Sequence, residues 1–193
     1  MIKFQNVTKI YQENIIVLQD VSFEIKEGEF VSIVGKSGAG KTTLIRMILG
    51  LEFPTYGEVF FDGESVSKAN SKILQKIRRK IGSVYQDYRL LPAKTVYENV
   101  AYIMEVEGKE NEEIEVEVPR VLEIIGLGDK MNNFPRELSG GEQQRLSIAR
   151  ALSGKTVVLS THNREIVNKL GKRVITIENG IIIRDEEKGR FII

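Results

Sequence analysis

A glycine-rich loop between a buried strand and a helix constrains the fold of this chain more than any other feature. The loop covers residues 35–43 and reads Gly-Lys-Ser-Gly-Ala-Gly-Lys-Thr-Thr; the apolar run Phe30–Val34 precedes it and the apolar-periodic stretch Leu44–Leu49 follows it. Because glycine permits backbone angles that side chains forbid, successive N–H groups can turn inward at a helix start and form an anion cradle. This arrangement predicts a loop that wraps the phosphate chain of a nucleoside triphosphate.

Each part of the loop has an expected contact with the nucleotide. Lys41 is expected to reach the β- and γ-phosphates, the Thr42 hydroxyl to ligate Mg²⁺, and Thr43 to contact the α-phosphate. The other expected nucleotide-binding residues are Gly35, Lys36, Ser37, Gly38, Ala39 and Gly40. The alternative is a glycine-rich turn that caps an ordinary helix, but the complete pattern in its strand–helix setting favours nucleotide binding.

Composition limits the kind of protein that can carry this loop. The chain has 193 residues, long enough for one core, with 28 basic and 27 acidic side chains, so we expect no nucleic-acid partner. It has no cysteine, which excludes a disulfide framework and a thiolate metal site. We find no secretory segment and no apolar run long enough to cross a bilayer, so we expect a cytoplasmic protein whose membrane role depends on a partner.

The segments around the loop predict two kinds of strand. Ile2–Phe4 and Val21–Ile25 alternate between apolar and polar residues, as strands of a half-exposed sheet do, whereas the continuous apolar run before the loop predicts a buried strand. Gly57–Asp62 predicts another short strand, followed by an Asp-Gly turn. Residues 1–30 and 57–66 are therefore expected to form an antiparallel accessory sheet beside the core that carries the loop.

The middle of the chain predicts helices. Ser71–Lys80 reads as a basic helix and Glu105–Glu117 as an acidic stretch, and in a near-neutral chain both are interpreted as solvated faces. Pro119, interpreted as a first-turn residue, and Gly126, at the far end, bracket a further helix. Residues 87–136 are therefore predicted to be a helical lobe inserted into an α/β core.

A second motif, well downstream of the loop, carries a family resemblance. Residues 138–145 read Leu-Ser-Gly-Gly-Glu-Gln-Gln-Arg and open an amphipathic helix through Leu146 and Ala149, where a serine hydroxyl and unhindered N–H groups can meet an anion. Alone, this is a simple helix cap. Together with the phosphate loop it resembles the signature of ATP-binding-cassette (ABC) ATPases. The resemblance implies a single α/β domain, with a P-loop NTPase (RecA-like) core, an antiparallel accessory sheet and an inserted helical subdomain.

The resemblance implies roles for residues outside the loop. Tyr11 would stack on adenine, Gln86 would join the magnesium shell and relay the nucleotide state, and His162 would contact the γ-phosphate. Taken singly, these three read as a half-buried aromatic, a surface amide and a structural histidine. The implied catalytic residues are Lys41, Gln86 and His162, the implied metal ligands are Thr42 and Gln86, and the implied cofactors are ATP and Mg²⁺.

The signature motif would act in trans. In the family, two subunits face head to tail, so that the signature helix of one covers the ATP held by the phosphate loop of the other. The residues of this homodimer contact with ATP would be Ser139, Gly140, Gly141 and Glu142.

Within the family, residues 85–100 are similar to those of the FtsE-like cell-division ATPases, most of all in the Asp-Tyr-Arg-Leu-Leu-Pro run over residues 87–92. This resemblance implies an integral membrane partner like FtsX and a peripheral position on the inner face of the cell membrane. The ATPase subunits of lipoprotein-export ABC transporters have similar motifs, so export remains an alternative. A binding module that nucleotide regulates without hydrolysis is another.

One expected unit is missing from the sequence. After the signature helix the family has a buried Walker B strand ending in Asp-Glu, a connecting loop and another helix, about 30–40 residues in all. Here Ala149–Ser153 leads through Gly154 and Lys155 straight into Thr156–His162. The carboxylates that complete magnesium binding and polarise the attacking water are therefore absent. Loss of a central parallel strand would expose or gap the buried sheet, and we expect weak ATP binding and impaired hydrolysis.

No other segment is expected to replace this unit. Val59–Asp62 belongs to the predicted accessory sheet, and Ile175–Gly180 is interpreted as a hairpin strand with its turn at Asn179-Gly180. An omitted stretch of sequence, an excision and a natural cassette that binds without hydrolysing remain open as explanations.

Overall fold

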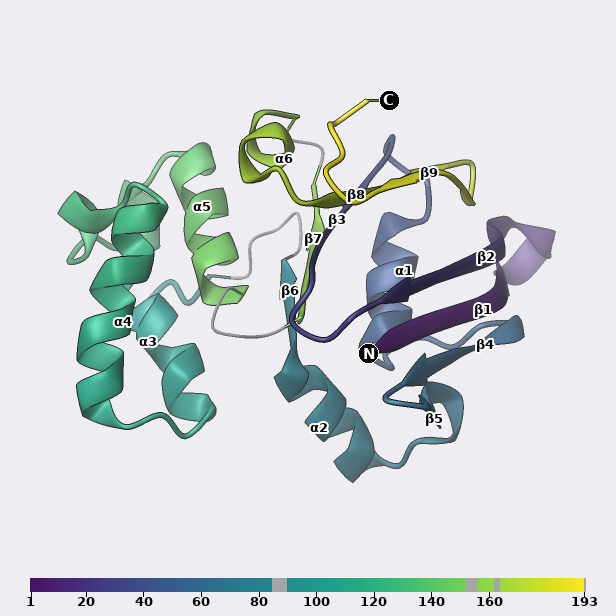
Figure 1. Cartoon of the computed structure of the whole chain (residues 1–193), viewed down its shortest axis with the longest axis horizontal. Helices are drawn as coiled ribbons and strands as arrows, with labels where there is room; N and C mark the ends of the chain where they lie inside the picture. Colours follow the sequence, from purple (N-terminus) through teal and green to yellow (C-terminus); the bar gives the residue numbers. More distant parts are fainter. Residues whose placement is uncertain (85–89, 152–155, 162–163, 193) are drawn as a thin grey trace. The chain divides into compact units, whose positions relative to one another are not determined.

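The computed structural model describes residues 1–84, 90–151, 156–161 and 164–192 (Figure 1). The chain divides into two compact units. The first contains residues 1–85 and 155–193, with both β-sheets and the phosphate loop, and the second contains residues 86–154, which are helical in the part that the structure describes.

The antiparallel sheet of the first unit has the strand order β2-β1-β4-β5. Its strands are β1 (Ile2–Ile10), β2 (Ile16–Ile25), β4 (Tyr56–Phe61) and β5 (Glu64–Ser65), and a short 3-10 helix, Gln12–Asn14, joins β1 to β2. Buried and exposed residues alternate at the start of β1, which is the predicted half-exposed pattern. Asp62 and Gly63 form the turn after β4 with φ angles of 50° and 84°, as expected of a tight hairpin turn.

The second sheet has the order β6-β7-β3-β8-β9. Its members are β3 (Phe30–Val34), β6 (Ile81–Val84), β7 (Thr156–Ser160), β8 (Arg173–Glu178) and β9 (Ile181–Glu186). The first four strands run parallel, and β9 returns antiparallel to β8. Every residue of β3 and β7 is buried, which explains their continuous apolar sequences. The predicted hairpin is confirmed, since Asn179 and Gly180 turn with φ angles of 48° and 79°.

The strands that the structure describes leave no gap in this sheet, contrary to the expectation of one. β6 pairs directly with β7, from Ile81 opposite Thr156 to Val84 opposite Leu159, and β7 pairs with β3. All parallel strands have nearly the same inter-strand spacing and backbone hydrogen-bond pattern. A strand can therefore pair with any parallel neighbour whose N–H and C=O groups are in register and whose two faces can be buried. The sheet therefore closes although only residues 152–155 separate the signature helix from β7.

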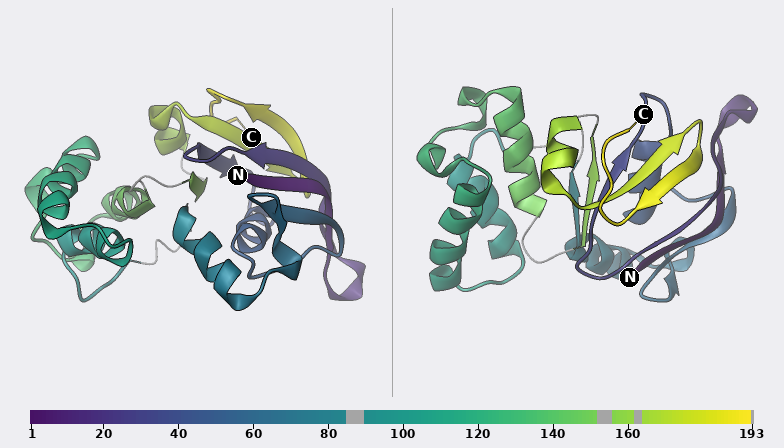
Figure 2. Two further views of the ribbon diagram at one scale, coloured as in Figure 1. Left: turned by 60° about the horizontal axis from the view of Figure 1, so that its bottom comes forward. Right: turned by 45° about the horizontal axis from the view of Figure 1, so that its top comes forward.

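The helix that follows the phosphate loop, α1 (Lys41–Ile48), lies between the two sheets (Figures 1 and 2). Its Leu44, Ile45, Met47 and Ile48 join residues of both sheets in one buried core. Gly50, with φ of 60°, follows the C-cap residue Leu49 and ends the helix. The unit is completed by a 3-10 turn, Val66–Lys68, by α2 (Ser71–Lys80) and by α6 (Arg164–Leu170).

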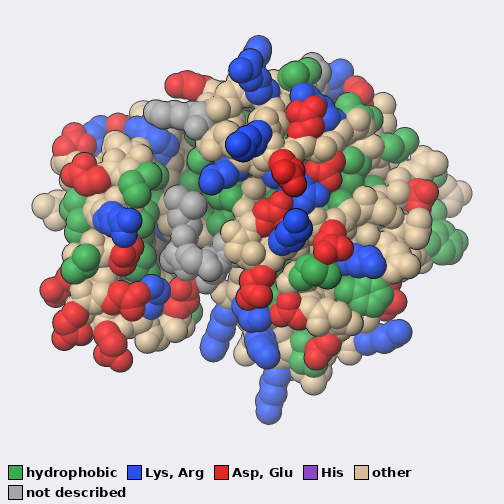
Figure 3. Space-filling view, in the orientation of Figure 1, with side chains coloured by type: hydrophobic (Ala, Val, Ile, Leu, Met, Phe, Trp, Pro, Cys, Tyr) green, Lys and Arg blue, Asp and Glu red, His purple; other side chains and the backbone are tan. Residues whose placement is uncertain are grey.

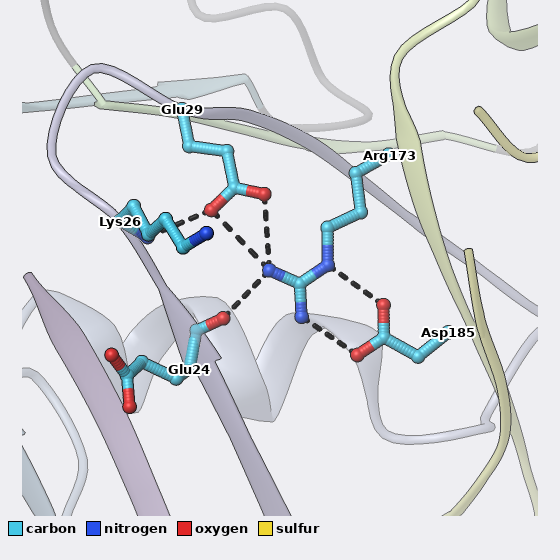
Figure 4. A network of polar contacts seen from close by, with 5 residues as sticks. All are labelled: Glu24, Lys26, Glu29, Arg173 and Asp185. Atoms are coloured by element: carbon cyan, nitrogen blue, oxygen red, sulfur yellow. Dashed lines mark hydrogen bonds and ion pairs between the residues drawn. The ribbon is translucent and has the colours of Figure 1, made fainter. Parts of the chain in front are cut away.

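One arginine holds four segments of the first unit together (Figure 4). Arg173, at the start of β8, donates two hydrogen bonds of 2.7 Å to the carboxylate of Asp185 in β9. Its third nitrogen reaches Glu29 Oε1 at 3.0 Å and the backbone oxygen of Glu24 at 2.7 Å. The side chain is only 15% exposed, so this planar fork ties β8 and β9 to the end of β2 and to the turn before β3.

The second unit is a packed group of helices. It contains α3 (Val96–Val106), α4 (Asn111–Ile124), α5 (Gly140–Ala151) and two 3-10 turns, Gly128–Lys130 and Pro135–Glu137. Their buried side chains form a separate core: Val96, Val100, Ala101, Met104, Ile114, Val118, Leu122, Leu127, Leu138, Leu146 and Ala149. The unit extends beyond the range 87–136 expected from the sequence, because α5 packs its apolar side on α3 and α4.

The sequence pattern predicts that Pro119 begins a helix. In the structure it lies inside α4 instead. The helix begins at Asn111, and Gly126, with φ of 68°, follows its end as predicted. Ile114, Val118 and Leu122 repeat at four-residue spacing and are buried, so packing of this face offsets the hydrogen bond that proline cannot donate. The same spacing is visible in the sequence, and here it outweighs the preference of proline for a first turn.

Charged side chains cover one exposed region of each unit (Figure 3). Lys72, Lys76, Arg78 and Arg79 of α2 are exposed, and so are most of the glutamates of the acidic stretch Glu105–Glu117 in α3 and α4. Both stretches are thus exposed to solvent, as predicted. In the described part of the chain, no helix has the length and apolar character needed to span a membrane.

Candidate nucleotide-binding site

The phosphate loop connects the carboxyl end of β3 to the first turn of α1. Gly35, Gly38 and Gly40 have φ angles of 156°, 79° and 104°, and Gly40 is the N-cap of α1. Residues with a Cβ rarely adopt such angles, so the predicted reason for these glycines is found in the structure. The loop brings its backbone to the N-terminal end of a buried helix, where the helix dipole favours an anion.

Two of these glycines are also fixed by close neighbours. A Cβ on Gly35 would lie 2.2 Å from the carbonyl oxygen of Ile177 in β8, and one on Gly40 would lie 2.8 Å from the carbonyl oxygen of Val17 in β2. A Cβ on Gly38 would meet none of the described atoms within 4 Å, and this glycine is exposed together with Lys36 and Ser37 at the tip of the loop. The base of the cradle is therefore held by β8 and β2, and its tip is open to a ligand.

Lys41 is folded back onto the loop. Its Nζ donates to the carbonyl oxygens of Gly35 at 2.8 Å and Lys36 at 2.7 Å, and the residue is 5% exposed. Burial lowers the pKa of this ammonium from its ordinary value. The cation is thus already desolvated beside the cradle, where its attraction for a phosphate is stronger than in water.

The two threonines after Lys41 differ in accessibility. Thr42 is exposed in the first turn of α1 and Thr43 is buried. Magnesium in nucleotide sites usually takes one or two protein oxygens together with phosphate oxygens and water. The accessible Thr42 hydroxyl fits that donor set, whereas the buried Thr43 is less accessible to a ligand.

Tyr11 lies in the same unit as the loop, directly after β1. Its N–H donates to the carbonyl oxygen of Ile15 at 2.9 Å, which closes the turn between β1 and β2. The residue is 39% exposed, with the Nζ of Lys9 5.0 Å from the centre of its ring. A ring held in this way can present a face to a planar base.

The signature motif caps its own helix. Ser139 donates to Glu142 Oε2 from its N–H at 2.8 Å and from its hydroxyl at 2.9 Å, and Lys130 reaches Glu142 Oε1 at 2.5 Å. The bond with Lys130, followed by those with Ser139, lowers the pKa of Glu142 to about 2. An ionised carboxylate would repel phosphate, so the geometry gives Glu142 the role of orienting Ser139.

Among the residues that the structure describes, nothing sterically requires the glycines of the signature. A Cβ on Gly140 would meet no described atom within 4 Å, and one on Gly141 would meet only Arg145 Nη1 of this set, at 3.9 Å. Both glycines are exposed in the first turn of α5, where N–H groups lack acceptors within the helix. Two unhindered glycines at an open helix start are what the close approach of an external group requires.

Gln86 and His162 lie outside the described residues. The strands that lead to them are described: β6 ends at Val84 and β7 at Ser160, and both run parallel to β3. The carboxyl ends of parallel neighbours meet at one edge of a sheet, so both strands end at the edge where β3 enters the phosphate loop.

Comparison with known proteins decides the family of this site. The family profile described as ABC transporter matches residues 18–161, which include the loop, the signature and β7. The chain belongs to the ABC transporter family. The cell division ATP-binding protein FtsE of Bacillus subtilis is 41% identical over 224 residues, covering 99% of this chain and 98% of the relative. FtsE of Mycobacterium tuberculosis is 39% identical over 225 residues, covering 99% and 98%.

Solved ABC cassettes share the fold. A dimeric post-hydrolysis state of the ATP-binding cassette MJ0796, bound to ADP and Pi, matches with a TM-score of 0.78 and 35% identity, covering 99% of this chain and all of that one. The chain is therefore an FtsE-like ABC ATP-binding subunit with a P-loop NTPase fold. ABC ATPases as a family bind and hydrolyse ATP.

The alignment with the Bacillus relative is longer than this chain. It spans 224 positions, whereas the chain has 193 residues, so the difference of about 31 positions belongs to the relative alone. That number lies within the length of about 30–40 residues expected for one strand, one helix and their loops.

Sequence reasoning missed three side chains that lie beside the predicted site residues. Lys130 neutralises Glu142, Lys9 lies over the ring of Tyr11, and Glu52 pairs with Lys9. The pairing of Ser139 with Glu142 follows the S-x-x-E spacing of a capping box and was available in the sequence. The partners of Lys130 and Lys9 are distant in sequence, and no local pattern indicates them.

Proposed function

We propose that this chain is the ATP-binding subunit of an FtsE-like ABC complex, in which Mg-ATP drives an FtsX-like integral membrane partner during cell division. The phosphate loop carries the proposal: three positive-φ glycines and the buried Lys41 at the end of β3 form a cradle for a triphosphate. The identity of 41% to an FtsE over nearly the whole chain supports the assignment to cell division rather than export.

Residues around the loop complete the proposed site. Tyr11 stacks on adenine, Thr42 and Gln86 ligate Mg²⁺ together with phosphate oxygens, and His162 contacts the γ-phosphate. The accessible Thr42 hydroxyl and the parallel ends of β6 and β7 beside β3 support this arrangement. The cation at Lys41 neutralises the phosphate charge that develops on transfer.

Nucleotide joins two copies head to tail in this proposal. Ser139, Gly140 and Gly141 of one copy cover the ATP bound by the loop of the other, while Glu142 orients the serine. The unhindered glycines at the open start of α5 support a contact from outside the chain. The relative MJ0796 was solved as a dimer with ADP and Pi.

Hydrolysis by this chain is slow. An ABC ATPase needs a carboxylate that polarises the attacking water, and this sequence has no apolar strand ending in Asp-Glu between the signature helix and β7. β9 does end in Asp185-Glu186, but it runs antiparallel to β8 and its Asp185 is bound by Arg173. The direct pairing of β6 with β7 and the longer alignment with FtsE support the loss of a whole strand–helix unit. The same observations favour a second function, a module in which bound ATP controls docking without turnover.

The proposed partner sets the location. The cassette associates with the inner face of the cell membrane through the cytoplasmic part of an FtsX-like protein, which the helical unit receives. The exposed surface of α3 and α4 supports a docking role for that unit.

Binding and turnover test the proposal separately. Wild-type protein whose measured intact mass is 21.9 kDa is titrated with Mg-ATP by calorimetry. Two variants are titrated in the same way: Lys41→Ala, and Lys72→Ala as a control at an exposed surface residue. We expect Lys41→Ala to weaken ATP binding by about 10–100-fold, since a charge-assisted contact is lost, and Lys72→Ala to bind like the wild type. Equal binding by all three contradicts the site. Turnover of about 1 s⁻¹ or more, typical of active enzymes, contradicts the slow cassette.

A further inference from the structure

A nearly buried ion pair lies behind the ring of Tyr11. Lys9 Nζ is 2.9 Å from Glu52 Oε1 and donates to the carbonyl oxygen of Phe53 at 2.9 Å. The side chains of Lys9 and Glu52 are 15% and 17% exposed. The same ammonium is 5.0 Å from the centre of the Tyr11 ring, within the range of a cation–π interaction. One face of the ring is therefore covered by a cation whose position is fixed by two oxygen partners.

Glu52 connects this group to the helix of the phosphate loop. Its Oε2 lies 3.3 Å from Nε of Arg46, which belongs to α1. Hydrogen bonding to Lys9, and more weakly to Tyr11, keeps the pKa of Glu52 below its ordinary value. The carboxylate thus remains ionised at neutral pH and holds two cations, one on β1 and one on α1.

The chain after Tyr11 returns directly to the phosphate loop. The 3-10 turn Gln12–Asn14 leads into β2, where the carbonyl oxygen of Val17 and the side chain of Leu18 lie against Gly40. Tyr11 is therefore attached to the loop on two sides, through β2 at Gly40 and through Glu52 at Arg46. A displacement of either attachment would move the ring relative to the cradle.

We propose that Lys9 is a positioning residue: it fixes one face of Tyr11 so that the other face receives the planar base of the nucleotide, and Glu52 and Arg46 tie this platform to α1. The inference rests on the proposed nucleotide binding and deepens it. Base–aromatic stacking contributes about 1–3 kcal/mol per base. A ring that is already immobilised loses little freedom on binding, and a cation behind it withdraws π density, which favours face-to-face stacking.

The test compares a ligand that has a base with one that has none. Mg-ATP and magnesium tripolyphosphate are titrated into the wild type, Lys9→Met and Lys9→Arg, with Lys3→Met as the matched control at an exposed lysine of β1. We expect Lys9→Met to weaken ATP binding about 3–10-fold and to leave tripolyphosphate binding unchanged. Lys9→Arg keeps the cation and should restore most of the affinity, and Lys3→Met should match the wild type.

A fluorescent reporter at the ring gives a second readout. The chain has no tryptophan, so Tyr11→Trp places a single indole at the stacking position. ATP is expected to quench it and tripolyphosphate to leave it bright, and adding Lys9→Met should shift the ATP titration to higher concentration. Glu52→Gln, which keeps the volume of the side chain, replaces Lys9→Met if that variant does not fold, and it should give the same selective loss.

The outcomes separate this inference from the proposed function. If Lys9→Met binds both ligands like the wild type, or loses both equally, Lys9 does not position a base and the inference is overturned. If the wild type binds neither ATP nor tripolyphosphate, nucleotide binding itself is overturned. A selective loss of ATP affinity that Lys9→Arg restores is the result that the inference requires.

Discussion

The phosphate loop and the signature motif are both glycine-rich segments at the start of a helix, but the chain treats them differently. Gly35 and Gly40 have positive φ angles and lie against backbone oxygens of β8 and β2, and Lys41 is buried beneath them. Gly140 and Gly141 are exposed, and in the described part of the chain no atom would lie closer than 3.9 Å to a Cβ on either of them. The fold of one chain therefore builds the candidate anion site at the phosphate loop. At the signature motif, the start of the helix is exposed at the surface of the chain.

This difference indicates where the ligand of each site comes from. A preorganised cradle binds without rearrangement, because its dipoles and cation already point at the ligand position. At the signature, Ser139 is occupied by Glu142, and only the N–H groups of the glycine turn lack partners within the helix. In the proposed head-to-tail dimer, a second copy would bring the phosphate to this open helix start.

Alanine substitutions at one glycine of each site give the largest expected difference. Gly35→Ala places a methyl 2.2 Å from the carbonyl oxygen of Ile177, so we expect a loss of about 2–4 kcal/mol in the free energy of unfolding, with loss of ATP binding. Gly141→Ala should change stability by less than about 1 kcal/mol, on the stabilising side, because alanine favours a helix. Urea unfolding and ATP titration measure both.

The same pair tests the open site. Gly141→Ala should still bind ATP as a monomer and should fail to dimerise with it in light-scattering measurements, since the methyl occupies the approach path. If Gly141→Ala destabilises the chain as much as Gly35→Ala does, the contrast between a built site and an open site is lost.

The next largest effect is expected at Arg173, which anchors the strand that supports Gly35. Arg173→Met leaves Asp185 and Glu29 without their shared cation, and we expect a loss of about 2–3 kcal/mol in unfolding free energy. Arg184→Met removes a local pair with Glu186 on the same hairpin and should cost less than about 1 kcal/mol. Equal losses in the two variants would show that the fork of Arg173 holds nothing beyond an ordinary surface pair.

Pro119→Ala sharpens the comparison in the helical unit. Alanine restores an N–H inside α4 and removes the clash of the proline ring, so we expect stabilisation by about 1–3 kcal/mol. The exposed Val116→Ala is the control and should stay within about 0.5 kcal/mol. If Pro119 began a helix, its replacement would leave stability unchanged or lower it; thermal unfolding by circular dichroism distinguishes the two.

The smallest expected effect is a pH dependence at the signature. The pKa of Glu142 is about 2 in the folded chain, below the value of about 4.3 of an unperturbed glutamate. Such a group stabilises the fold above the unfolded pKa, and that contribution disappears as the pH falls toward the folded pKa. Unfolding measured at pH 5 and pH 2.5 should therefore show a steeper decline for the wild type than for Glu142→Gln. Glu112→Gln, on the exposed side of α4, should follow the wild type.

Local patterns in the sequence predict the parts of the fold that local chemistry determines. The loop, β3, α2 and the Asn179-Gly180 hairpin lie where the glycines, the apolar runs and the turn residues indicate. The prediction for α4 is too short, because it follows the restriction that proline imposes, whereas the burial of one helix face determines where the helix begins.

Long-range contacts were beyond sequence reasoning. Arg173 meets Glu29, and Lys9 meets Glu52, only after the strands have assembled, and no spacing in the chain indicates either pair. The direct pairing of β6 with β7 was missed for a similar reason. The sequence shows that an expected strand is absent between them, but whether the two strands can pair depends on their buried faces and their register in the folded chain.

The β6–β7 ladder also determines what inserting a further strand between β6 and β7 would require. A strand entering between the two must first separate four residue pairs and move β6 outward by one strand spacing, about 4.8 Å. Insertion of a strand there would consequently have to compete with the existing pairing of β6 with β7, because no unpaired position is open between them. β6 ends at Val84, two residues before Gln86. Such an insertion would therefore move this end of β6 away from β7 by the same distance.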